Sequence, residues 1–216
     1  AWRLWEAAAE GGMPAHDPPE IVEADLAPLL LDCAAWGLSD PARLAWIDPP
    51  PQPAVAEARR RLVALHALNA DGAITAHRKA LAQLPLPPGL AHMLLVAANG
   101  GQEDIAAKLA MLVSEPGLGG RGEDIAARLP RWERERGERA EAARKAAARW
   151  AAKARQLARG ADSGGPTATA SPGLLLATAF PDRVARRRAA GGEDWLSAGG
   201  RGFRLDPESS LSAATW

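Results

Sequence analysis

The residues best suited to chemistry lie in two arginine-rich stretches near the end of the sequence. The first is PDRVARRR, from Pro181 to Arg188, and the second is GRGFR, from Gly200 to Arg204. Guanidinium groups bind phosphate oxygens and aromatic rings stack on bases, so this composition is typical of single-stranded nucleic-acid binding. A solvated charge run, or an interface to another domain, would have the same composition. The candidate contact residues are Arg183, Arg186, Arg187, Arg188, Arg201, Arg204 and Phe203.

A second basic set lies upstream, on a predicted helix. Together with Arg144 and Lys145, the basic side chains of this helix spread around its circumference. A solvated helix with ion pairs is therefore favoured over a dedicated binding groove. The secondary candidate contacts are Arg149, Lys153, Arg155 and Arg159.

We find no motif of a catalytic or metal site in the sequence. The four histidines and Cys33 have none of the spacings of a zinc site, so we expect structural or surface roles for them. The glycine-rich stretch from Gly117 to Asp124 lacks the Gly-Lys-Ser/Thr ending of a P-loop. We interpret it as a loop between helices. This chain is expected to hold no catalytic residue, metal or cofactor.

Charge is distributed unevenly along the chain, although the formal net charge is zero. Residues 1–120 contain eight basic and fourteen acidic side chains, whereas residues 121–216 contain eighteen basic and twelve acidic ones. A polyanion should therefore prefer the second half. A single cysteine excludes an intrachain disulfide and fits the cytoplasm, and no apolar run reaches the roughly 20 residues of a membrane span.

The elements that must position these residues are predicted to be mainly α-helical. The chain is rich in Ala, Leu and Arg, has no Tyr, and has few β-branched residues. A helix over 54–68 places Val55, Ala58, Leu62 and Leu65 on one apolar stripe. Asp71-Gly72 predicts a type I′ hairpin turn. Thr75 would then cap a helix over 76–84.

Further helices are predicted over 20–33, interrupted near Pro28, and over 89–98, 102–114 and 131–159. The last is expected to break near Gly137, with its tryptophans on one core-facing stripe. Residues 160–172 have a linker composition. The run at 174–180 is predicted to be a buried strand, and 193–207 to form two strands around Gly199-Gly200.

The ordered motifs resemble a known family. These are Pro19-Glu20-Ile21, DPPP at 48–51, ALNADGAIT at 67–75 and LPLPPGLAHMLL at 84–95. In this order they are similar to the region that follows the second RecA-like domain of DEAH-box ATP-dependent RNA helicases, most of all the bacterial HrpB group. The similarity covers nearly the whole chain.

The resemblance implies a domain order. Residues 1–17 would be the tail of an absent RecA-like domain, 18–85 a winged-helix domain and 86–160 a helical ratchet-like domain. Residues 161–172 would be a linker or loop, and 173–216 an incomplete OB-like β segment. In this family such domains pack on the RecA-like motor domains of the same chain and help to form a channel for single-stranded RNA, or DNA. ATP and Mg would bind in the motor and not here.

The chain departs from the family pattern at four positions. His66 and Asn69 stand where Gly and Asp are usual, Arg78 stands for Gly, and Gly89 stands for Arg. We therefore carry over no contact at position 66 or 89.

Two other classes of function compete with the helicase interpretation. One is a stand-alone winged-helix DNA-binding regulator that reads the major groove with Arg59, Arg60 and Arg61. The acidic balance of the first half disfavours it. The other is a protein-interaction module that docks a partner through its helices and tryptophans.

Overall fold

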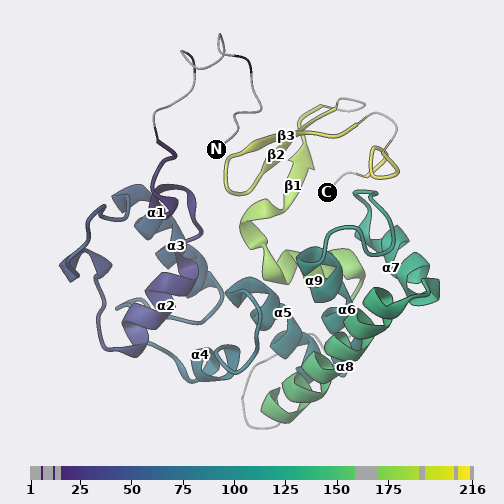
Figure 1. Cartoon of the computed structure of the whole chain (residues 1–216), viewed down its shortest axis with the longest axis horizontal. Helices are drawn as coiled ribbons and strands as arrows, with labels where there is room; N and C mark the ends of the chain where they lie inside the picture. Colours follow the sequence, from purple (N-terminus) through teal and green to yellow (C-terminus); the bar gives the residue numbers. More distant parts are fainter. Residues whose placement is uncertain are drawn as a thin grey trace.

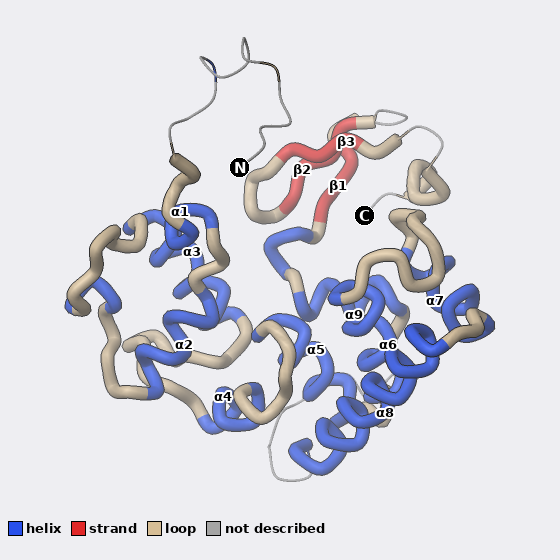
Figure 2. Tube along the Cα trace, in the orientation of Figure 1, coloured by secondary structure: helices blue, strands red, loops and turns tan. Residues whose placement is uncertain are grey.

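The computed structural model describes residues 6, 12, 16–158, 170–189, 193–206 and 209–214. Helices make up most of this part of the chain, and one small sheet lies near its end (Figure 1, Figure 2). The prediction of a mainly α fold is confirmed. The expected tail at 1–17 and the expected linker at 161–172 lie almost wholly outside the described residues, as does Arg159.

The predicted first helix is two helices, α1 (Glu20–Glu23) and α2 (Ala27–Ala35). The chain leaves α1 at Ala24, whose backbone is extended with ψ 153°. Pro28 lies in the first turn of α2, where a missing N–H removes no helical hydrogen bond. The interruption was predicted correctly, but Pro28 begins the second helix and does not kink the first.

Helix α3 (Gln52–Ala64) packs on α2 and follows a short 3-10 turn, η2 (Pro41–Arg43). Val55, Ala58, Leu62 and Leu65 are all buried, which confirms the predicted apolar stripe. The helix ends at Ala64, four residues earlier than predicted.

The end of α3 is a Schellman motif with His66 in the left-handed region at φ 54°. The His66 N–H donates to the Val63 carbonyl at 2.9 Å, and the Ala67 N–H donates to the Leu62 carbonyl at 2.9 Å. This position usually holds glycine, because a Cβ crowds the backbone there. The motif ends the helix before Leu68.

The hairpin that follows contains a single bridge, between Leu68 and Ile74. Gly72 has φ 80°, but Asp71 does not have a positive φ, so the predicted type I′ turn is wrong. Instead the Gly72 N–H donates to the Asn69 carbonyl at 3.0 Å, and the Asn69 side chain accepts from the Ala73 N–H at 2.8 Å. The longer loop needs only one left-handed residue.

Five helices follow: α4 (Ala76–Leu81), α5 (Pro88–Asn99), α6 (Glu103–Ser114), α7 (Ile125–Arg134) and α8 (Glu138–Ala158). Thr75 caps α4, as predicted, by accepting from the Arg78 N–H at 3.1 Å. Buried alanines from Ala140 to Ala154 let α8 pack closely on α5 and α6. No helix within the described ranges is long and apolar enough to cross a membrane.

The helix predicted over 131–159 is divided between α7 and α8. Gly137, at φ 113°, lies between the two helices, which confirms the predicted break near this residue. Trp132 therefore lies on α7 and is fully buried, while Trp150 lies on α8 and is half-buried. The predicted core role of Trp132 is confirmed, but the two rings do not share one helix face.

Residues 174–180 do not form the predicted buried strand. Helix α9 (Pro172–Ala179) occupies this segment, and Ser171 caps it by accepting from the Leu174 N–H at 3.3 Å. A short apolar run fits a buried strand or a buried helix equally well, and here the cap and the proline begin a helix. Leu175 and Ala179 pack into the core beside α5.

A three-stranded antiparallel sheet completes the described chain, in the order β1 (Ala185–Arg187), β2 (Asp194–Ser197) and β3 (Gly202–Arg204). In Figure 1 and Figure 2 it lies beyond α9, away from α2–α4. The two strands predicted around Gly199-Gly200 are confirmed as β2 and β3. Strand β1 is not among the predicted strands, because its two arginines and single apolar residue indicate only a basic cluster.

Candidate nucleic-acid interface

The register of the sheet divides the candidate arginines between its two faces. Arg186 lies opposite Leu196, whereas Arg187 lies opposite Trp195. Neighbouring side chains of a strand point to opposite faces, and β2 follows this rule with Asp194 and Leu196 exposed and Trp195 buried. The candidate contacts therefore cannot act as one cluster.

One face of the sheet carries a row across the three strands in which Trp195 is buried and Arg187 half-buried, whereas the Phe203 side chain is 45% exposed. The Arg187 guanidinium lies 5.2 Å from the centre of the Trp195 ring, and Trp195 pairs with Phe203. The Nε and Nη2 atoms of Arg187 are buried, and no hydrogen-bond partner for them is found in the described structure. Arg187 thus covers Trp195 and is a structural residue of the sheet.

The exposed face holds Arg186, Arg188 and Arg204, which we call the arginine face. The side chain of Arg188 is exposed, and its backbone N–H continues the ladder by donating to the Asp194 carbonyl at 3.0 Å. Arg204 Nε lies 3.1 Å from Asp194 Oδ1, but the two side chains are 71% and 58% exposed. An ion pair so exposed is weak, so Arg204 remains available to a phosphate.

Leu196 adds an apolar surface to the arginine face, because its side chain is 43% exposed between Arg186 and Gly202. Gly202 has no side chain, which leaves a flat area beside Leu196 on the edge strand β3. Cations around a flat apolar area suit a single strand, whose phosphates and bases need both.

Arg183 and Arg201 lie at one end of the sheet and not on this face. Arg183 lies in the 3-10 turn η3 (Pro181–Arg183), and its guanidinium lies 4.7 Å from the centre of the Phe180 ring. Arg201 follows the β2–β3 turn, and its backbone N–H donates to Ser197 Oγ at 3.1 Å. The Gly199 N–H donates to the Asp182 carbonyl at 2.8 Å, which holds the turn beside η3.

The secondary basic set on α8 does not form a common surface. Arg155 Nε donates to Glu103, and its Nη2 lies 3.4 Å from Asp104, both at the start of α6. The hydrogen bond to Glu103 raises the pKa of the Arg155 guanidinium. Arg155 therefore forms ion pairs that join α8 to α6. Arg149 is exposed, and Lys153 is half-buried.

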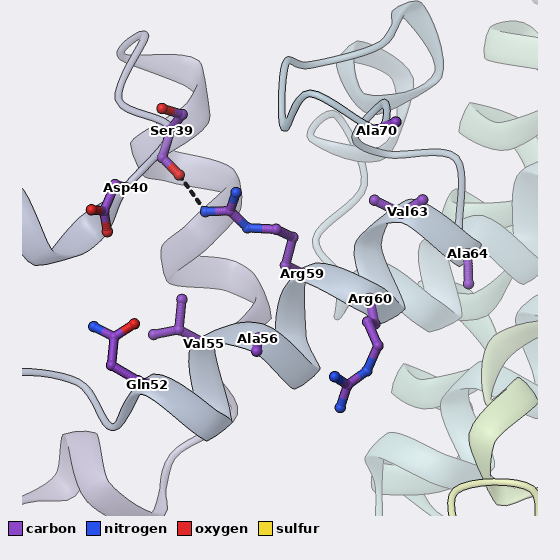
Figure 3. Close-up of a pocket in the computed structure, with 10 residues that line it drawn as sticks. All are labelled: Ser39, Asp40, Gln52, Val55, Ala56, Arg59, Arg60, Val63, Ala64 and Ala70. Atoms are coloured by element: carbon purple, nitrogen blue, oxygen red, sulfur yellow. Dashed lines mark hydrogen bonds between the residues drawn. The ribbon is translucent and has the colours of Figure 1, made fainter.

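Two of the three arginines of the competing DNA-reader hypothesis, Arg59 and Arg60, line a cavity of about 810 Å³ beside α3 (Figure 3). Arg59 reaches across it and donates to the Ser39 carbonyl at 2.6 Å. Arg60 points the other way in Figure 3.

The other two arginines of this set have carboxylate partners. Arg60 pairs with Glu57, and Arg61 Nη2 donates to Asp25 Oδ1 at 2.7 Å. All three guanidinium groups thus have partners within the chain. This arrangement disfavours a recognition helix that must present free cations to DNA.

Sequence reasoning missed a histidine cluster. His77 Nε2 lies 2.8 Å from His92 Nδ1, and the His66 and His92 ring centres are 6.3 Å apart. Burial lowers the pKa of His92 to about 4, so its ring is neutral at neutral pH. Within the described part of the chain, no group of three or more His, Cys, Asp or Glu residues is arranged to hold a metal ion.

Comparisons with known proteins place this geometry in context. No protein-family model matches the chain. The ATP-dependent RNA helicase HrpB of Escherichia coli (strain K12) is 34% identical over 206 residues, which are 94% of this chain and 23% of that protein. The human probable ATP-dependent RNA helicase DHX35 is 32% identical over 113 residues, or 51% of this chain and 16% of that protein.

The fold agrees with the sequence comparison. The crystal structure of the E. coli DExH-box NTPase HrpB matches 98% of this chain with a TM-score of 0.69 and 32% identity. The match covers 24% of that chain, so the protein described here spans about a quarter of the length of HrpB. The chain therefore belongs to the HrpB-like DEAH helicases and corresponds to part of their C-terminal region.

Proposed function

We propose that this chain is an accessory region of an ATP-dependent RNA helicase and that its arginine face contacts single-stranded RNA. The observation that carries the proposal is the exposed position of Arg186, Arg188 and Arg204 around Leu196 and Gly202. The names of the similar helicases support RNA as the ligand. Single-stranded DNA has the same phosphates and would bind the same face.

We also propose the domain roles that the resemblance implies. Residues 18–85 would be a winged-helix domain, 86–160 a ratchet-like domain and 173–216 part of an OB-like domain. Together with the RecA-like motor domains of the same protein they would form the channel for the strand. ATP and Mg would bind in the motor, and this region would have no ATPase activity of its own.

The charge distribution supports RNA contact in the second half of the chain. Residues 121–216 carry six more basic than acidic side chains, and residues 1–120 carry six fewer. Each phosphate that an arginine neutralises releases a counterion, so the affinity should fall steeply as salt is raised.

Binding of a fluorescent oligouridylate to the 216-residue chain, measured by anisotropy over a salt series, tests the proposal. Replacing Arg186, Arg188 and Arg204 together with alanine should weaken binding about tenfold and reduce the slope of log K against log salt by about 2. The control is Arg60→Ala, which removes an exposed arginine of α3, far along the chain from the sheet. If the triple variant and the control bind alike, the arginine face is not the RNA site.

A further inference from the structure

A second cationic site lies beside the glycine-rich loop between α6 and α7. Its cavity has a volume of about 480 Å³. Arg121 belongs to the loop, Arg128 to α7 and Arg139 to α8, so the arginines that line the cavity come from three segments. Among the described residues, no acidic side chain lines this cavity. The lining residues are Pro116, Gly117, Gly120, Arg121, Arg128 and Arg139.

The loop is held in a defined conformation. Gly117, Gly119 and Gly120 all have positive φ, at 91°, 65° and 96°. A Cβ on Gly119 would lie 2.3 Å from the Arg128 carbonyl oxygen, so the loop backbone packs directly on α7. The Gly119 N–H donates to Glu135 Oε2 at 2.9 Å. The cavity is therefore formed before any ligand binds.

Backbone carbonyls orient two of the three guanidinium groups. Arg128 donates from Nε and Nη2 to the Leu118 carbonyl at 3.1 and 3.0 Å. Arg139 Nη2 donates to the Pro116 carbonyl at 2.8 Å. A carbonyl positions a guanidinium but leaves its full positive charge in place.

Carboxylates neutralise this charge only in part. Glu115 Oε2 lies 3.5 Å from Arg139 Nη2, and the two side chains are 52% and 65% exposed, so this ion pair is weak. Glu135 accepts from the loop backbone. On its other side Arg121 also lines a neighbouring cavity that contains the carboxylates Glu123, Asp124 and Asp206. No ion pair of Arg121 or Arg128 is found in the described structure.

We propose that the cavity formed by Arg121, Arg128 and Arg139 binds a phosphate group. Guanidinium groups match phosphate oxygens with paired N–H donors, and all three arginines line this cavity. The phosphate can come from an RNA backbone or from a free phosphate ion. Because the cavity lies on the helical body, its phosphate binding does not depend on the arginine face of the sheet.

The test is a titration of the ¹⁵N-labelled 216-residue chain with sodium phosphate at constant ionic strength, followed by NMR. We expect saturable shifts of the Gly117, Gly119 and Gly120 amides, and about tenfold weaker binding in the variant Arg121→Gln with Arg139→Gln. Arg128 is left intact because it holds the loop. The control is Arg136→Gln, an exposed arginine that does not line the cavity.

A second titration, with oligouridylate, distinguishes the two sources of phosphate. If RNA shifts the same amides and the double variant removes these shifts, the RNA backbone is a source; if only free phosphate does so, the site serves the ion. Non-saturable shifts, or equal shifts in the double variant and the control, would overturn the proposal.

Should the double variant misfold, Arg121→Gln alone must still weaken binding. The triple variant of the arginine face should bind phosphate normally, so the two proposals can fail separately.

Discussion

His66 shows how a single residue can depart from the family pattern and still keep the local structure. It occupies the left-handed position of the Schellman motif at φ 54°, where the family usually has glycine. The carbonyl of His66 accepts a hydrogen bond from Thr75 Oγ1, which joins the end of α3 to the start of α4. The motif is therefore retained at a conformational cost of about 1 kcal/mol.

Replacing His66 with glycine should raise the free energy of unfolding by about 1 kcal/mol, because glycine adopts this φ without strain. Urea unfolding followed by circular dichroism measures the change. The control is His66→Ala, which removes the ring but keeps the Cβ and should give no such gain. A loss of stability in the glycine variant would mean that contacts of the ring with His92 outweigh the strain.

At the scale of residues, composition identified the candidate RNA contacts but not their separation. The arginines at 183–188 and 201–204 are visible in the sequence, yet Arg187 faces Trp195 and Arg186 faces Leu196 only because of the strand register. That register depends on pairing between segments that local sequence does not specify. The histidine cluster escaped prediction for the same reason, since His77 and His92 meet through the packing of α4 on α5.

At the scale of elements, the contact between α5 and α9 requires glycine at position 89, where the resemblance to the family implies arginine. A Cβ on Gly89 would lie 2.3 Å from the Ala179 carbonyl oxygen. No larger side chain fits there while α9 keeps its position. The sequence could not indicate this contact, because the run at 174–180 is short enough to be interpreted as a strand.

Replacing Gly89 with alanine should lower the free energy of unfolding by about 2 kcal/mol, although alanine is the better helix former. Gly173→Ala is the matched control, because a Cβ there meets nothing within 4 Å, and this variant should be neutral or slightly stabilising. Chemical denaturation of both variants gives the comparison. Equal stability of the two would contradict the close packing of α5 on α9.

At the scale of the whole molecule, one continuous apolar core joins α2 to α9. The sheet adjoins α9 through η3, and Trp195 is buried without belonging to that core. The charge asymmetry and the helices up to α6 could be predicted from local patterns, whereas α9 was predicted as a strand. The arginine face required β1, which the sequence did not indicate because its three residues include two arginines and no alternating apolar side chain.

RNA-stimulated ATP hydrolysis by the longer helicase to which we propose this region belongs tests the proposed RNA contact most directly. We compare it with the variant in which Arg186, Arg188 and Arg204 are alanine. We expect unchanged ATP hydrolysis without RNA, and an RNA concentration for half-maximal stimulation that is about tenfold higher in the variant. Stimulation at the same RNA concentration in both proteins would contradict it.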